Sequence, residues 1–137
     1  MSNLRLATAT RNAMMDAVET LVDTGSGAAT VKLYSGTQPV DANTGLSGNT
    51  LLATFTLDDP AFGTSSSGTI TLAGVPRATT GVAAGTATWF RMANIGAATI
   101  CDGDVGTASA TLILNTTTIS IGVAVSITAG SLTQPAG

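Results

Sequence analysis

Hydrophobic residues recur with the period of a helix near the N-terminus of the chain. The positions that share one helical face are Met14, Met15, Val18, Leu21 and Val22. Thr8 or Thr10 can cap the beginning of this helix, and Gly25 can adopt the left-handed conformation that ends it. The pattern therefore predicts an amphipathic helix over residues 9–24. It either covers one open side of its own domain, which we favour, or docks in a groove of a neighbouring subunit.

After residue 28, short runs rich in Thr, Val and Ile are separated by segments of Gly, Asn, Pro and Ser. These runs predict strands at residues 30–34, 51–57, 68–73, 86–93, 98–101, 110–114 and 118–127. Trp89 and Phe90 make the fourth run the most aromatic, so we expect it to cross the centre of the core. The pattern predicts a mainly β fold, an antiparallel β-sandwich of about seven strands or a small barrel, with one N-terminal helix.

The remaining segments suggest how the chain is divided. Residues 35–49 form a long predicted loop that either contacts partners or is disordered, and residues 74–85 form a second loop. We expect an N-terminal arm and helix at 1–27, a β-sandwich domain at 28–128 and a flexible C-terminal tail at 129–137.

Charge is scarce, with five Lys and Arg against eight Asp and Glu, and a formal net charge of -3. The five cations are spread along the chain, whereas a nucleic-acid surface concentrates them, so nucleic acid is not an expected partner. With only 9% charged residues, much of the polar surface must come from Thr, Ser, Gly and Asn. We infer that partners cover part of this surface, the alternative being a neutral monomer coated with Thr.

The sequence offers little reactive chemistry. There is no His, which removes the most common general base and the usual partner of a catalytic Ser or Cys, so we predict no enzyme, no catalytic residues and no cofactor. The single cysteine, Cys101, excludes an intrachain disulfide and lies in an apolar run, where a buried thiol is expected. No run of about 18 apolar residues predicts a membrane span, and the N-terminus lacks a secretory pattern, so we expect synthesis in a cytoplasm.

Two acidic clusters are candidates for calcium binding. Asp102-Gly103-Asp104 resembles the opening of a calcium loop, but the further oxygen ligands and the distal Glu are missing, so a hairpin turn is the simpler interpretation. Asp58-Asp59 precedes Pro60 and is better explained as the end of a strand. We therefore predict no metal site.

Several segments together resemble small virion proteins of tailed bacteriophages. They are NLRLATATRNAMMDAV, ATVKLYSGTQP, LLATFTLDDPAFG, GTATWFRMAN and GDVGTASATLILNTTTISIGVAVSI. The likeness rests on the order of the N-terminal helix, the Leu33–Gly36 strand end, the Trp89–Arg91 strand and the Leu114–Thr116 turn, and it covers most of the chain. The resemblance implies a head decoration or cement protein on the capsid surface, seated as homo-oligomers on the major capsid protein.

Two other functions stay open at this point. One is a tail or head-to-tail connector subunit, which is also a structural role in the virion. The other is a carbohydrate- or calcium-binding adhesion module, which would use Asp102, Asp104 and the loops. The helix face from Met14 to Val22 is the candidate partner contact.

Overall fold

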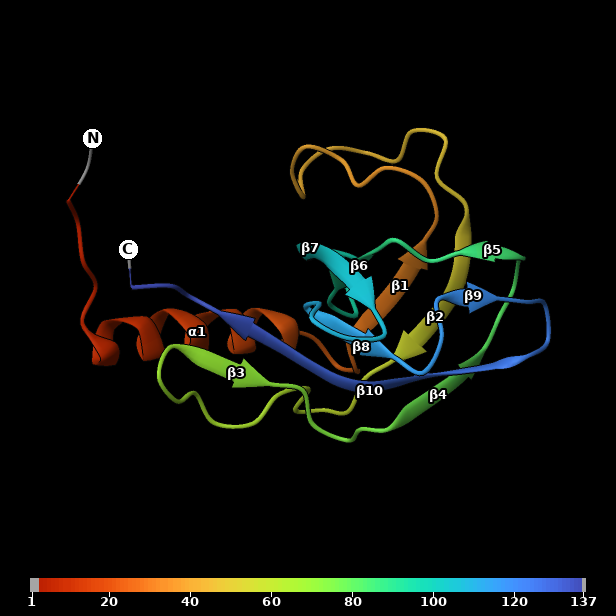
Figure 1. Ribbon diagram of the computed structural model, residues 1–137. Coiled ribbons are helices and arrows are strands. Elements are labelled where there is room, and N and C mark those ends of the chain that lie inside the picture. The colour runs from red at the N-terminus through yellow and green to blue at the C-terminus, as the bar shows by residue number, and fades with distance from the viewer. Residues whose placement is uncertain (1–2, 137) are drawn as a thin grey trace.

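A computed structural model describes residues 3–136 as one helix followed by ten strands. The elements are α1 (Thr8–Val22), β1 (Thr30–Tyr34), β2 (Leu51–Thr56), β3 (Thr69–Thr71), β4 (Arg77–Thr80), β5 (Gly85–Thr86), β6 (Trp89–Ala93), β7 (Thr99–Gly106), β8 (Leu112–Leu114), β9 (Thr118–Ile119) and β10 (Ala124–Thr133). The helix lies along one end of the strands, beside β3 and the end of β10 (Figure 1). The expected mainly β fold with one N-terminal helix is confirmed.

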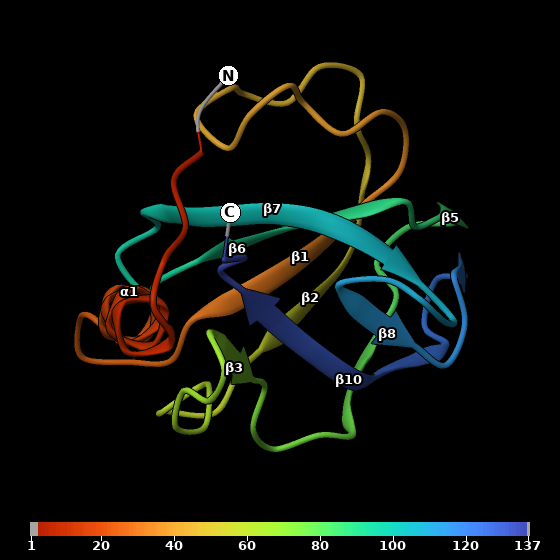
Figure 2. The ribbon, with the colours of Figure 1, turned by 60° about the vertical axis from the view of Figure 1, so that its left-hand side comes forward.

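The strands form one strongly curled sheet in the order β2-β1-β6-β7-β8-β10-β3, with β4 paired to β10 (Figure 2). The β7–β8 pair is parallel and the other pairs are antiparallel. Val82, just after β4, donates its N–H to the carbonyl of Leu52 in β2 at 2.8 Å, which draws the two sides of the sheet together. The curled sheet is therefore a half-barrel, which agrees with the barrel-like alternative. Beside it, β5 and β9 form a small separate pair.

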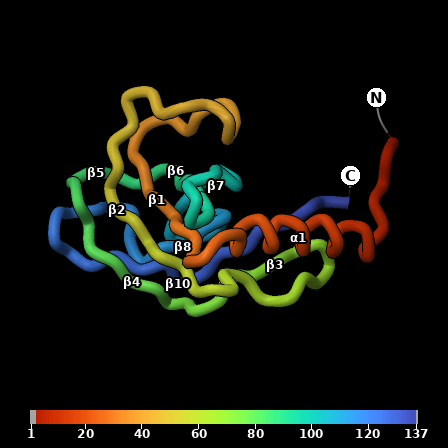
Figure 3. Tube along the Cα trace, turned by 180° about the vertical axis from the view of Figure 1, so that it is seen from behind, coloured from red at the N-terminus to blue at the C-terminus, as the bar shows by residue number. Residues whose placement is uncertain are grey.

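The concave side of the sheet holds the hydrophobic core. Side chains alternate between the two faces of a strand, and Leu33 of β1, Phe55 of β2 and Phe90 of β6 all point into the core and are buried. Ile127 of β10 joins them from the other side. The helix closes the open end of this core, as seen from behind in Figure 3, with Met15, Val18 and Val22 packed against it.

A second buried cluster lies on the convex face of the sheet. The rings of Tyr34 and Trp89 are stacked with centroids 4.8 Å apart, and the Arg91 guanidinium lies 5.4 Å from the centroid of the Trp89 ring. Arg91 donates from Nε and Nη2 to the two carboxylate oxygens of Asp102 at 2.7 and 2.8 Å. Its Nη2 also donates to the carbonyl of Thr44 at 2.7 Å. This contact ties the 35–49 loop to the convex face, so the central strand β6 is covered on both sides (Figure 2).

The expected hairpin turn at Asp102-Gly103-Asp104 is wrong, because all three residues lie within β7. A Cβ at Gly103 would lie 2.6 Å from Cε1 of Phe90, so the glycine is needed where the Phe90 ring packs against the strand. Each aspartate has a local partner, Arg91 for Asp102 and Thr111 for Asp104. These contacts explain why two acidic residues are accommodated inside a strand.

Other boundaries also differ from the sequence-based expectation. Strand β4 lies in the expected 74–85 loop, where pairing with β10 overrides a polar sequence. The single run at 118–127 is divided at Gly122, which has φ of +75°, and β10 then continues through Thr133. Residues 129–133 pair with β8 and β3, so the sheet extends into the segment assigned to the C-terminal tail.

The helix begins at Thr8 and ends at Val22, close to the expected range. The predicted Thr cap is wrong, because the residue before the helix is Ala7, whose methyl group cannot accept a hydrogen bond. Gly25 has the expected left-handed φ of +111°, but it lies two residues beyond the C-cap Asp23.

An acidic pair fixes the end of the helix to the loop after β2. Asp23 accepts a hydrogen bond from the backbone N–H of Ala61 at 3.1 Å. Burial raises the pKa of neighbouring Glu19 to about 7, and a hydrogen bond to Asp23 and repulsion by its charge add to the shift. Glu19 therefore keeps a proton in the folded chain at pH values where it would lose the proton in the unfolded chain.

We predict that replacing Arg91 destabilises the fold far more than replacing Arg77. The side chains of Arg91 and Asp102 are only 15% and 3% exposed, so Arg91→Ala leaves a buried carboxylate unpaired and lowers the free energy of unfolding by about 3 kcal/mol. Arg77 pairs with Asp58, but these side chains are 28% and 44% exposed, so Arg77→Ala costs under about 1 kcal/mol. Urea unfolding followed by far-ultraviolet circular dichroism measures both, and equal losses would contradict this assignment.

We also predict that stability falls as the pH rises from 5 to 8. Because the pKa of Glu19 is raised on folding, its contribution is complete below its unfolded pKa of 4.5 and is lost as the pH passes 7. The Glu19→Gln variant should flatten this dependence and raise Tm at pH 8 by about 3 °C. Asp59→Asn, at an exposed carboxylate, serves as the control in thermal unfolding scans, and an unchanged pH profile in Glu19→Gln would refute the prediction.

Candidate functional site

The residues of the helix face that was predicted to contact a partner differ in their exposure to solvent. Met15 and Val22 are buried, and Val18 is half-buried against the core of the same chain. Met14 and Leu21 are exposed, and two turns of helix separate them. The face therefore serves mainly to cover its own domain, and contact with a partner through Met14 and Leu21 stays a prediction.

The 35–49 loop presents the most exposed large apolar side chain among the described residues. Val40 is 93% exposed, and Leu46 of the same loop is also exposed. The loop is nevertheless held in place, because Asn49 donates to the carbonyls of Ser35 and Thr37 at 2.8 and 3.0 Å. We name residues 35–49, which carry the exposed side chains of Val40 and Leu46, the apical loop.

Inside the apical loop, Asp41 organises a turn. Its Oδ1 accepts hydrogen bonds from the N–H of Asn43 and the hydroxyl of Thr44, both at 2.9 Å. The carbonyl of Thr44 in turn accepts from Arg91 of the convex cluster. A shallow hollow of about 310 Å³ lies within the loop. The apical loop is thus a positioned structure, as a surface that recognises another protein requires.

A second apolar surface lies at the end of the sheet away from the helix. Val82, Ile121 and Val123 are all exposed there, and we name them the edge patch. The backbone brings them together, because Gly81 donates to the carbonyl of Val123 at 3.0 Å and accepts from Gly122 at 2.9 Å. The segments that carry the edge patch lie at the opposite end of the molecule from α1 (Figure 1).

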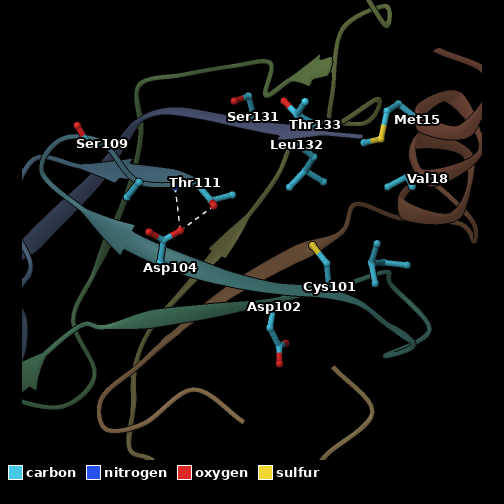
Figure 4. A pocket seen from close by; sticks show the side chains of 12 residues that line it. Met15, Val18, Cys101, Asp102, Asp104, Ser109, Thr111, Ser131, Leu132 and Thr133 are labelled. Carbon is cyan, nitrogen blue, oxygen red and sulfur yellow. Dashed lines mark hydrogen bonds between the residues drawn. The ribbon is translucent and has the colours of Figure 1, made fainter. Parts of the chain in front are cut away.

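A groove of about 650 Å³ runs between β7 and β10 beside the helix (Figure 4). Its walls are Met15, Val18, Ile100, Cys101, Asp102, Asp104, Ser109, Ala110, Thr111, Ser131, Leu132 and Thr133. Asp104 accepts hydrogen bonds from the hydroxyl and the N–H of Thr111 at 2.7 and 3.1 Å, and these bonds lower its pKa. The groove therefore combines apolar walls with the carboxylate of Asp104, whereas Asp102, which also lines it, is paired with Arg91. Nothing in the sequence signalled it, since it depends on strands far apart in the chain.

The acidic residues considered for calcium do not come together. Asp58 pairs with Arg77, and Asp102 pairs with Arg91. Asp104 is directed toward Thr111, whereas Asp102 is directed away from it (Figure 4). Over residues 3–136, no three Asp, Glu, Cys or His side chains are grouped so that they could hold a metal ion. The aspartates named in the adhesion hypothesis therefore do not form a calcium site in this part of the chain.

Cys101 lines the groove as a free, half-buried thiol. Burial raises the pKa of the thiol to about 11, and the charge of Asp102 adds to the shift. We predict that iodoacetamide alkylates the folded chain at pH 7.5 at least ~100-fold more slowly than the urea-unfolded chain, because only the thiolate attacks. Mass spectrometry over time measures both rates, and similar rates would contradict the assignment.

No helix within residues 3–136 has the length and apolar character needed to cross a bilayer. The geometry instead offers three surfaces, which are the apical loop, the edge patch and the groove between β7 and β10. Comparisons with family models, with curated proteins and with solved structures give no match to this chain.

Proposed function

We propose that the chain is a structural protein of a tailed-phage virion, most specifically a decoration protein that binds the shell of major capsid protein. The observation that carries the proposal is the placement of exposed apolar side chains on two separate, backbone-ordered surfaces, the apical loop and the edge patch. A decoration protein has to bridge neighbouring subunits, and two apolar surfaces suit a bridge.

The magnitude of the apolar contribution supports such a role. Full burial of one Val or Leu side chain is worth roughly 1.5–3 kcal/mol, so contact through Val40 and Leu46 supplies several kcal/mol of binding. Few charges would have to be desolvated in these contacts, because only 9% of the residues are charged. Many copies on a symmetric shell would add to the effect.

The resemblance to small virion proteins supports the particle setting. Two quoted segments include parts of the cluster that holds the apical loop, namely β1 with Tyr34 and β6 with Trp89 and Arg91. A chain of this family that keeps this cluster keeps its apical loop positioned, which is the property that a shell-binding surface needs. The expected partner is the major capsid protein.

Cryo-electron microscopy of the phage particle tests the assignment directly. Density for this chain is expected on the head shell, at positions that follow capsid symmetry. Copies arranged around the tail axis would favour the connector subunit instead. Absence of the chain from the whole particle would remove both virion roles.

We predict that charges at the exposed apolar positions of the apical loop weaken shell binding without unfolding the chain. Val40→Asp combined with Leu46→Asp should weaken cosedimentation with capsid shells at least ~10-fold, because each carboxylate would have to be desolvated in the contact. Thr64→Asp is the matched control, at an exposed position in the loop before β3. Thermal unfolding should be unchanged in both variants, and full binding by the double variant would rule out the apical loop as the contact.

A further inference from the structure

The sheet contains a gap between β7 and β10. The edge of β7 away from β6 pairs with β8 only at the last two residues of β7, so residues 99–104 present an edge that no other described strand pairs. On the other side, β10 pairs with β8 as far as Gly130, and Ser131 donates to the carbonyl of Thr111 at 3.3 Å. Beyond that point both strands border the groove, because β8 is only three residues long.

The gap has the position and length of a missing strand. Strand β8 runs parallel to β7 and antiparallel to β10, so a strand that continued β8 backwards from Leu112 would lie between them. The chain instead turns away before Leu112, where Thr111 is bonded to Asp104. The unpaired edge of β7 covers six residues, which corresponds to about 20 Å of extended chain. A segment inserted there would bond to two sheet edges at once.

The two faces of this position differ in character. Met15 and Val18 of α1 and Leu132 of β10 line its concave side and pack against the core. A small apolar hollow, lined in part by core residues of β6, adjoins the groove there. On the other side, Asp104 lies opposite Trp89 of the convex cluster. Because alternate side chains of a strand point to opposite faces, an inserted segment needs an apolar residue at every second position.

The carboxylate of Asp104 has no cation beside it. Hydrogen bonds from Thr111 lower the pKa of Asp104, so it is ionised at neutral pH. Among the described residues, no Lys or Arg lines the groove, and the two ion pairs use Asp58 and Asp102 instead. A Lys or Arg on the polar side of an incoming strand would complement this charge.

We propose that the groove between β7 and β10 binds an extended segment of the major capsid protein, with alternating apolar side chains and a Lys or Arg that faces Asp104. The ten described strands of this chain already pair with one another, so the segment comes from another protein. This inference rests on the proposed function and adds a main-chain contact to the apical loop and the edge patch. Main-chain bonds supply affinity, and the apolar walls select the side chains.

Hydrogen exchange on the shell-bound chain tests the proposal. The full chain is mixed with capsid shells that lack it, and mass spectrometry compares deuterium uptake in the free and bound states. Amides that face the groove within residues 99–104 and 131–133 should exchange at least ~10-fold more slowly in the bound chain, because the inserted strand bonds to them. Binding with unchanged exchange at both segments overturns the groove as the site and leaves the decoration role standing. A chain that does not bind shells overturns both.

Filling the groove tests the same contact by mutation. Ser131→Trp places a large ring in the groove from an exposed position, so it should weaken cosedimentation with shells at least ~10-fold at unchanged Tm. Ser26→Trp, at an exposed serine in the turn after α1, is the matched control and should bind as the wild type does. Full binding by Ser131→Trp contradicts insertion of a strand.

Removal of one charge tests the expected Lys or Arg of the partner. Asp104→Asn keeps an oxygen that accepts from Thr111 but removes the charge, so it should weaken shell binding about threefold at low salt. The difference from wild type should shrink as salt is added, since salt screens the lost pair. Equal binding of Asp104→Asn and wild type at low salt contradicts this pairing.

Discussion

The stacking of Tyr34, Trp89 and Arg91 on the convex face is the interaction on which the arrangement of this molecule depends. It buries the single tryptophan outside the main core, where Asp102 neutralises the cation that covers it. Strand β6 is thereby enclosed on both faces and becomes the centre of the sheet. The same arginine holds the apical loop through Thr44. One cluster thus stabilises the sheet and holds the apical loop in place.

The parts of the fold that the sequence predicts are those governed by local patterns. The helical period gives α1, and alternation with large apolar residues gives β1, β2 and β6 at nearly their observed bounds. Strand β4 escapes prediction because RATT is polar and becomes a strand only through its pairing with β10. The extension of β7 through Gly103 escapes for a related reason. An acidic Asp-Gly-Asp segment is typical of a turn, and only the packing of Phe90 on the glycine shows why it is extended here.

The candidate surfaces, too, could be predicted from the sequence only where a local pattern marks them. The length and composition of the 35–49 loop suggested either a contact surface or disorder. Its order depends on Asn49 and Arg91, which lie at or beyond its end. The helical face was predicted as a unit, yet packing uses three of its five residues within the chain. The groove could not be predicted, because it exists only where a three-residue strand fails to fill the space between two longer ones. Surfaces created by differences in strand length leave no local pattern in a sequence.

The hydrogen bond between Leu6 and Ala136 places the first and last parts of the described chain side by side. The domain can therefore be treated as a nearly closed loop of polypeptide. A short glycine linker from residue 136 to residue 6 would permute the chain circularly, with new ends opened at the exposed Gly45. Such a permutant would carry fused cargo from the apical loop, which gives the domain a second point of attachment for display.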